Sequence, residues 1–223
     1  MPSETVVLTD QETLADLGTF FARARSIDDG AIMVQGAGSA LALYVPVLYP
    51  ENLGDPVPTI LGMRAIALET PAKVAGIYPL SALTDRLARM DGTALELIMP
   101  PAEVSASWAG RSVPRGGWEL LATIDDDALI SRANDGMSAV AQALPENAGK
   151  PVLATVRSRI WSTPMSGIAP QLNVQMPLGI AFGAQTLGFL RPGATSTLFG
   201  SGPWLRLSST GGHILARQGG ILG

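Results

Sequence analysis

The first apolar residues of the chain recur at helical spacing. Leu14, Leu17 and Phe21 are three or four positions apart, which is typical of a helix with one buried face. Thr9 and Glu12 form a capping box, in which the Thr hydroxyl can accept a backbone N–H and the Glu can reach back to the cap. We therefore expect a helix that begins at Thr9 and ends near residues 26–30.

After this helix the pattern changes to short apolar segments separated by glycines. Residues 31–35 and 41–49 flank Gly36-Ala37-Gly38-Ser39, which predicts two strands joined by a tight turn. Similar patterns predict strands at 59–68, 95–99, 195–199 and 204–208, and helices at 79–90, about 123–144 and about 177–190. Residues 152–161 and 171–176 are expected to be extended, with a helix as the alternative for the first segment. The fold class is α+β, with a mixed or antiparallel sheet and packed helices.

The order of predicted elements near the two ends of the chain is similar. A helix followed by a glycine-linked hairpin occurs at about 9–50 and again at about 176–210. We interpret this as two pseudo-symmetric helix-plus-hairpin units that share one core, in a single domain over residues 1–223. Coincidence between two ordinary hairpins is the alternative, and both interpretations stay open.

Composition limits the chemistry that the chain can perform. Charged residues make up 15% of the 223 residues, against roughly 25% in typical soluble domains, so the surface is largely neutral or partly covered in an oligomer. There are no cysteines, which excludes disulfides, thiolate metal sites and thiol nucleophiles.

Two segments bear on membranes and export. The first eight residues include Glu4 and lack the basic start and apolar run of a secretory signal, so we expect a cytoplasmic protein. Residues 160–190 carry no charge, but three prolines and several amide side chains interrupt the apolar run that a spanning helix needs. We expect no transmembrane segment.

Charge is distributed unevenly along the sequence. All 19 acidic residues lie between Glu4 and Glu146, so the first 146 residues carry about −10. The remaining 77 residues contain no Asp or Glu and hold Lys150, Arg157, Arg159, Arg191, Arg206, Arg217 and His213. Either the two parts contact each other, within one subunit or across a homodimer, or the basic part binds an anionic ligand. The total charge of −4 makes nucleic acid the less favoured partner.

No motif predicts catalysis, a cofactor or a metal. The glycines of Gly36-Ala37-Gly38 would need a Gly or Ala at Leu41 to form a dinucleotide fingerprint, and a strand follows in place of a helix. His213 has no Gly-x-Ser-x-Gly elbow to accompany it. Asp125-Asp126-Asp127 suits a helix N-terminus better than a cation loop. We therefore favour a protein without enzymatic activity.

The candidate ligand-binding residues are basic and aromatic side chains of the last third. They are Arg157, Arg159, Trp204, Arg206, His213 and Arg217. Trp204 and Arg206 are two positions apart in a predicted strand, so they share a face and can form an aromatic and cationic surface. The alternative is a core tryptophan covered by the arginine stem.

Several segments together resemble a family of conserved hypothetical proteins from actinobacteria. The resemblance is carried by the helix Leu14–Arg25 with its hairpin, by Met176-Pro177-Leu178 through Gly188-Phe189-Leu190, and by Gly202-Pro203-Trp204-Leu205-Arg206-Leu207. The chain differs from such relatives near its C-terminus, where Gly211-Gly212-His213 stands in place of a Tyr-Gly pair. The resemblance implies no catalytic residues.

Three functions are consistent with these observations. The first is a non-catalytic binding or assembly module that self-associates, which fits the low charge content and the absence of a catalytic motif. The second is a small enzyme or ligand-binding protein that acts on an anionic small molecule through His213 and the nearby arginines. The third is a peripheral binder of anionic lipid or nucleic acid.

Overall fold

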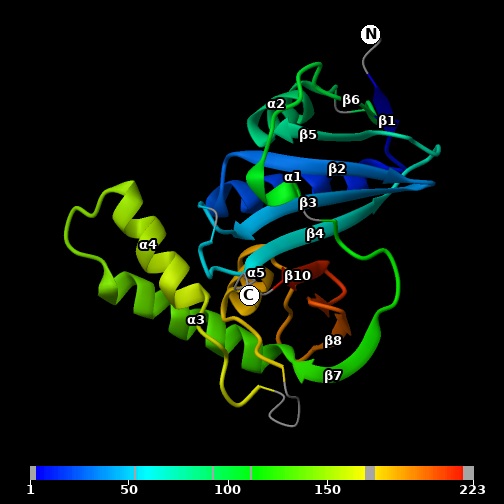
Figure 1. Ribbon diagram of the computed structural model, residues 1–223. Coiled ribbons are helices and arrows are strands. Elements are labelled where there is room, and N and C mark those ends of the chain that lie inside the picture. The colour runs from blue at the N-terminus through cyan, green and yellow to red at the C-terminus, as the bar shows by residue number, and fades with distance from the viewer. Residues whose placement is uncertain (1–3, 53, 92, 111, 169–173, 218–223) are drawn as a thin grey trace. The chain divides into compact units, whose positions relative to one another are not determined.

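The computed structural model describes residues 4–52, 54–91, 93–110, 112–168 and 174–217 (Figure 1). The chain divides into two compact units. Unit 1 comprises Met1–Pro46 and Met63–Gly110, and unit 2 comprises Val47–Gly62 and Arg111–Gly223.

Unit 1 is built on antiparallel strands and two helices. Its elements are β1 (Thr5–Val7), α1 (Gln11–Ile27), β2 (Ala31–Ala37), most of β3 (Ala40–Leu48), the second half of β4 (Thr59–Ala67), β5 (Ala75–Pro79), α2 (Leu80–Arg89), β6 (Glu96–Ile98) and the 3-10 helix η1 (Ser107–Gly110). Strand β2 pairs with β3 on one side and with β5 on the other. Strands β1 and β6 form a separate antiparallel pair.

Helix α1 begins one residue later than the sequence pattern indicates. The N-cap is Asp10, whose carboxylate accepts the backbone N–H of Thr13 at 2.7 Å. This hydrogen bond lowers the pKa of Asp10. Thr9 lies outside the helix, with its hydroxyl 2.9 Å from that of Thr13. The predicted Thr9 cap is therefore wrong, because the carboxylate of the next residue takes the free N–H.

The outer side of β5 is partly occupied by the segment that follows β6. The backbone N–H of Val104 donates to the carbonyl of Ile77 at 2.9 Å. Ile77 pairs with Met33 of β2 on the inner side. The segment around Val104 thus covers part of the edge of this sheet.

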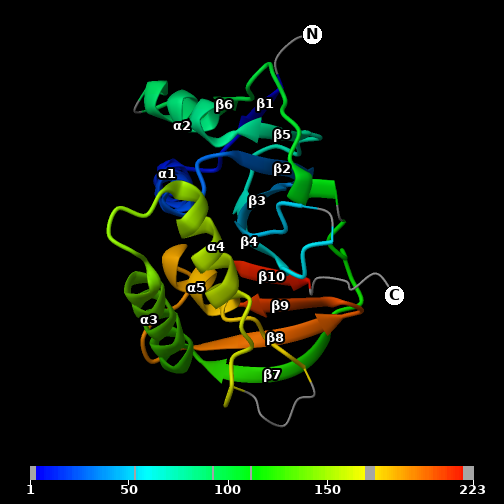
Figure 2. The same cartoon turned by 60° about the vertical axis from the view of Figure 1, so that its left-hand side comes forward.

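Unit 2 contains four consecutive antiparallel strands of a sheet and three helices. Its elements are β7 (Glu119–Asp125), α3 (Asp126–Ala143), α4 (Lys150–Trp161), α5 (Gly179–Thr186), β8 (Thr195–Ser201), β9 (Trp204–Ser208) and β10 (His213–Arg217). The strands are hydrogen-bonded in the order β10-β9-β8-β7. Figure 2 shows the three helices on one side of these strands.

Trp161 joins the three helices of unit 2. Its ring, at the end of α4, stacks on Phe182 of α5 with centroids 4.2 Å apart. On α3, a Cβ atom added to Gly136 would lie 2.4 Å from the Trp161 ring. Helix α5 also needs glycines, since Cβ atoms at Gly179 and Gly183 would come within 2.9 Å of Ile60 and Val47.

The aspartates at the start of α3 hold the connection between α5 and β8. Asp125 is the N-cap residue but makes no side-chain cap hydrogen bond. The buried carboxylate of Asp126 accepts the Ser196 hydroxyl at 2.5 Å and the backbone N–H of Arg191 at 2.9 Å. Asp127 accepts the backbone N–H of Gly193. These carboxylates therefore stabilise a tertiary contact in addition to the helix terminus.

The predicted α+β fold with an antiparallel sheet is confirmed. A helix followed by a hairpin occurs in each unit, as α1-β2-β3 and as α5-β8-β9, with the turn glycines Gly38 and Gly202 at positive φ. The single domain over 1–223 and the internal repeat over about 9–50 and 176–210 stay predictions.

Other expectations fail. Residues 152–161 form part of helix α4, which is the alternative and not the favoured extended segment, and Thr123–Asp125 belong to β7 and not to the following helix. Strands β1, β5, β7 and β10 were not predicted. Of the predicted extended segment 171–176, residues 171–173 lie outside the described residues, and 174–176 form no strand. No helix within the described residues is long and apolar enough to cross a membrane.

Candidate functional site

The hairpin of β9 and β10 brings four of the predicted ligand-binding residues together. In its register, Trp204 lies opposite Arg217, and Ser208 lies opposite His213. Because side chains alternate along a strand, Trp204, Arg206, His213 and Arg217 lie on the same face of the sheet. The sequence indicated this grouping only for the first two, which are neighbours on one strand.

The other two predicted residues, Arg157 and Arg159, lie on the helical side of the sheet. Ile214, on the face opposite to His213, contacts the backbone of α5 at Gly183. Arg157 of α4 lies over the Phe182 ring of α5, 5.5 Å from its centroid, and Arg159 is exposed on α4. The six candidate residues therefore do not form one site.

Arg206 lies against two aromatic rings. Its guanidinium carbon is 4.5 Å from the centroid of Trp118 and 4.6 Å from that of Phe199. Phe199 lies directly opposite Arg206 on β8, and Trp118 is oriented by its indole N–H, which donates to the carbonyl of Pro114 at 3.2 Å. Burial lowers the pKa of Arg206, which still stays charged at neutral pH.

One atom of this arginine is unsatisfied. Arg206 Nε is buried and has no hydrogen-bond partner among the residues that the structure describes. The residue as a whole is only partly buried. The rings fix the plane of the group, and a fixed guanidinium is suited to paired hydrogen bonds with an oxyanion.

His213 borders the same face. Its Nδ1 lies 2.9 Å from the Ser208 hydroxyl on the neighbouring strand. Burial lowers the pKa of His213, and the positive charge of Arg206 lowers it further. The imidazole is therefore mostly neutral at pH 7, and it can donate or accept one hydrogen bond at Nδ1.

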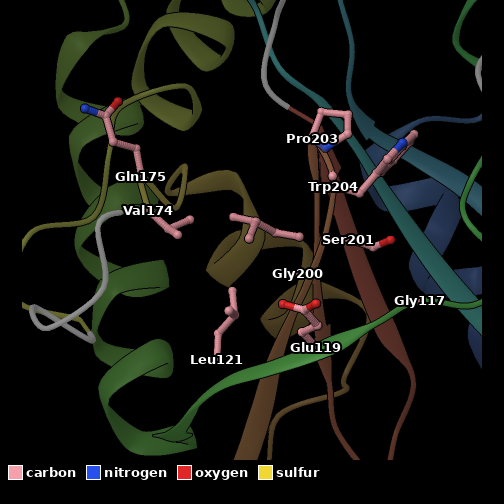
Figure 3. Close-up of a pocket in the computed structure, with 11 residues that line it drawn as sticks. Gly117, Glu119, Leu121, Val174, Gln175, Gly200, Ser201, Pro203 and Trp204 are labelled. Carbon is pink, nitrogen blue, oxygen red and sulfur yellow. The ribbon is translucent and has the colours of Figure 1, made fainter.

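A pocket of about 610 Å³ lies at the end of the β8–β9 hairpin (Figure 3). Glu119 and Leu121 of β7 and Val174 border it together with the hairpin turn, and Glu119 is its charged lining residue. Neither Arg206 nor His213 lines it. Sequence patterns indicated the glycines of this turn but not Glu119, because the strand that carries Glu119 was not predicted.

The described residues include no group of three or more His, Asp or Glu side chains placed to hold a metal ion. The chemistry that unit 2 presents is therefore that of a restrained arginine and a neutral histidine on the sheet, and of one carboxylate in a largely uncharged pocket.

Comparison with family models divides the chain near the boundary between the units. Residues 1–110 match a domain of unknown function, DUF8010, and residues 113–221 match another, DUF8185. No protein in a search of curated proteins matches the chain significantly. Membership of the actinobacterial family stays a prediction.

Solved structures of bacterial sliding clamps are similar in fold. A DNA polymerase III beta subunit from Eubacterium rectale aligns with a TM-score of 0.56 at 8% identity, covering 96% of this chain and 64% of that one. The beta sliding clamp of Caulobacter crescentus gives 0.54 at 12%, covering 98% and 65%. The DNA polymerase sliding clamp of Pseudomonas aeruginosa gives 0.53 at 10%, covering 98% and 64%. The chain has the fold of a sliding clamp and spans just under two thirds of the length of these proteins.

Proposed function

We propose that this chain is a non-catalytic assembly module that self-associates through strand β7. The observation that carries the proposal is Leu120, which lies on the terminal strand of the unit 2 sheet with 66% of its surface exposed. The backbone of a terminal strand has hydrogen-bonding groups that no neighbouring strand uses, so such a strand is a template for pairing with another chain.

The geometry of β7 supports pairing with a second copy. An irregularity in the pairing with β8 falls between Leu120 and Ala122, at Leu121. Leu121 packs against Gly200, where an added Cβ would lie 3.0 Å from its side chain, while Leu120 faces outward. Two β7 strands related by a twofold axis would run antiparallel and bury both Leu120 side chains.

Two further observations are consistent with assembly. The chain has a low charge content, as interfaces between permanently associated copies do. The clamps to which its fold is similar include proteins described as subunits of DNA polymerase III. A DNA partner has less support, because the net charge is −4 and the basic side chains Arg157 and Arg206 lie on different sides of the unit 2 sheet.

Sedimentation velocity over a range of protein concentrations tests the proposal. We expect the wild-type chain to sediment at twice the mass of the monomer, and Leu120→Lys to sediment as a monomer. A lysine on a terminal strand disfavours pairing because its ammonium would have to be desolvated in the interface.

Two matched variants show whether the effect belongs to β7. Val152→Lys introduces the same charge at a 44% exposed site on α4 and should leave the dimer intact. Ile98→Lys introduces the same charge on β6, at a residue that is 50% exposed. A monomeric wild type would overturn self-association, and dissociation by Ile98→Lys but not by Leu120→Lys would overturn the assignment to β7.

A further inference from the structure

We propose that the guanidinium of Arg206 binds an oxyanion, a carboxylate or a phosphoryl group, on the β9–β10 face of unit 2. This ligand site lies next to β7, because Phe199 is opposite both Leu120 and Arg206, but it is proposed independently of the self-association. It rests on the contacts of Arg206 and on the charges that surround it.

The orientation of the guanidinium restricts the ligand. The guanidinium carbon lies over the Trp118 and Phe199 rings, 4.5 and 4.6 Å from their centroids, so these rings occupy space around the group that a stacking ligand would need. The N–H groups of a guanidinium all point outward in its own plane, and an acceptor must approach along that plane. Two oxygens of one carboxylate or phosphoryl group match the spacing of two neighbouring N–H groups.

The described residues provide Arg206 with no carboxylate at ion-pair distance, and Nε has no acceptor. Arg25 and Arg64 differ in this respect, since Arg25 pairs with Asp29 and Arg64 pairs with Asp16. No described carboxylate neutralises this guanidinium, so an oxyanion that reaches its terminal N–H groups would gain charge-assisted hydrogen bonds.

Neighbouring side chains add to the attraction for an anion. His213 and Arg217 lie on β10 at positions diagonal to Arg206, on the same face of the sheet. Such diagonal positions have Cα atoms roughly 7–8 Å apart, within reach of long side chains. Arg217 contributes a second positive charge, and the largely neutral His213 contributes a hydrogen-bonding ring.

Isothermal titration calorimetry on the full chain tests the site with two probes. N-acetylglycine supplies a carboxylate and inorganic phosphate supplies a phosphoryl group, each compared with chloride at the same ionic strength. We expect saturable binding of at least one probe that chloride does not reproduce. Arg206→Gln should weaken that binding roughly tenfold or more, because the charge-assisted hydrogen bonds are lost.

A change in tryptophan fluorescence on binding, lost in Trp118→Phe, would place the ligand beside Trp118. Arg206→Lys keeps the charge without the planar pair of donors and should bind more weakly than wild type. Arg159→Gln removes one charge from α4 and should bind as wild type does.

The variants also separate this site from the dimer. Leu120→Lys should retain oxyanion binding even if it is monomeric. Binding equal to that of chloride, or undiminished in Arg206→Gln, would overturn the proposal. If Arg206→Gln does not fold, wild-type affinity in Arg206→Lys would overturn it instead.

Discussion

His213 is the only histidine of the chain, and its environment makes stability depend on pH near neutrality. Burial and the charge of Arg206 hold its pKa below the ordinary value of 6.5. Between the lowered pKa and 6.5, the unfolded chain binds a proton that the folded chain does not. The free energy of unfolding should therefore have its full value above pH 6.5 and decrease as the pH falls below it. Urea unfolding at a series of pH values from 7 to 5 measures this decrease.

His213→Gln removes the titrating group and should flatten the decrease between pH 7 and 5. Ser208→Ala is the matched control, because it removes the 2.9 Å hydrogen-bond partner but keeps the buried imidazole. It should lower stability at every pH and retain the slope. Equal slopes in wild type and His213→Gln would contradict the prediction.

Sequence patterns identified part of the surroundings of Arg206 and missed the rest. Trp204 and Arg206 could be placed on one face because alternation within a strand is a local property. The contact with Trp118 joins residues far apart in the sequence, and no local pattern reports it. Arg157 was grouped with Arg206 by charge alone, and charge does not reveal that one residue lies on a helix and the other on the opposite face of the sheet.

Among the helices, the contact between Gly136 and Trp161 gives a direct test of packing. Alanine normally favours a helix over glycine by about 1 kcal/mol. At Gly136, however, the added Cβ would lie 2.4 Å from the Trp161 ring. We expect Gly136→Ala to lower the free energy of unfolding by about 1–3 kcal/mol, because the overpacked ring must move. Urea unfolding followed by near-UV circular dichroism measures the change.

Gly116→Ala serves as the comparison, since a Cβ there meets nothing within 4 Å and φ is not positive. Its effect should stay within about 0.5 kcal/mol. If Gly136→Ala were as stable as this control, the close packing of α3 against Trp161 would be contradicted.

At the level of secondary-structure elements, sequence patterns favoured the wrong conformation for α4 and missed β7. Val152, Val156 and Ile160 are β-branched, which favoured an extended segment, although their spacing of four is also helical. Packing of α4 against α3 and α5 stabilises the helical conformation over the extended one. Strand β7 escaped prediction because Leu120 is exposed beside Leu121, so the simple alternation of a half-buried strand is missing.

For the whole molecule, self-association predicts that thermal stability depends on protein concentration. A dimer that forms only in the folded state raises the unfolding temperature as concentration rises, by mass action. We expect the wild-type unfolding temperature to rise by a few degrees over a hundredfold range of concentration, and that of Leu120→Lys to stay constant. Scanning calorimetry measures both. A constant temperature for the wild type would argue against the dimer.

The division into two units did not follow from charge. The acidic part of the sequence ends at Glu146, but unit 2 already begins with Val47–Gly62 and resumes at Arg111. Acidic residues such as Glu119 and Asp126 therefore belong to the same unit as the C-terminal arginines. Composition alone could not show this, because the charge boundary falls in the connection between α3 and α4 and the structural boundary before β7.

The hydrogen bond from Val104 to Ile77 has a consequence for how far association can proceed. It occupies part of the edge that β5 would otherwise offer to another molecule. When the β7 strands of two copies pair with each other, both β7 edges are covered and the assembly stops at a dimer. If β7 of one copy paired with β5 of another, each added copy would leave one strand edge exposed, so that further copies could add. By obstructing the second kind of contact, the segment around Val104 favours a closed particle over fibrous growth.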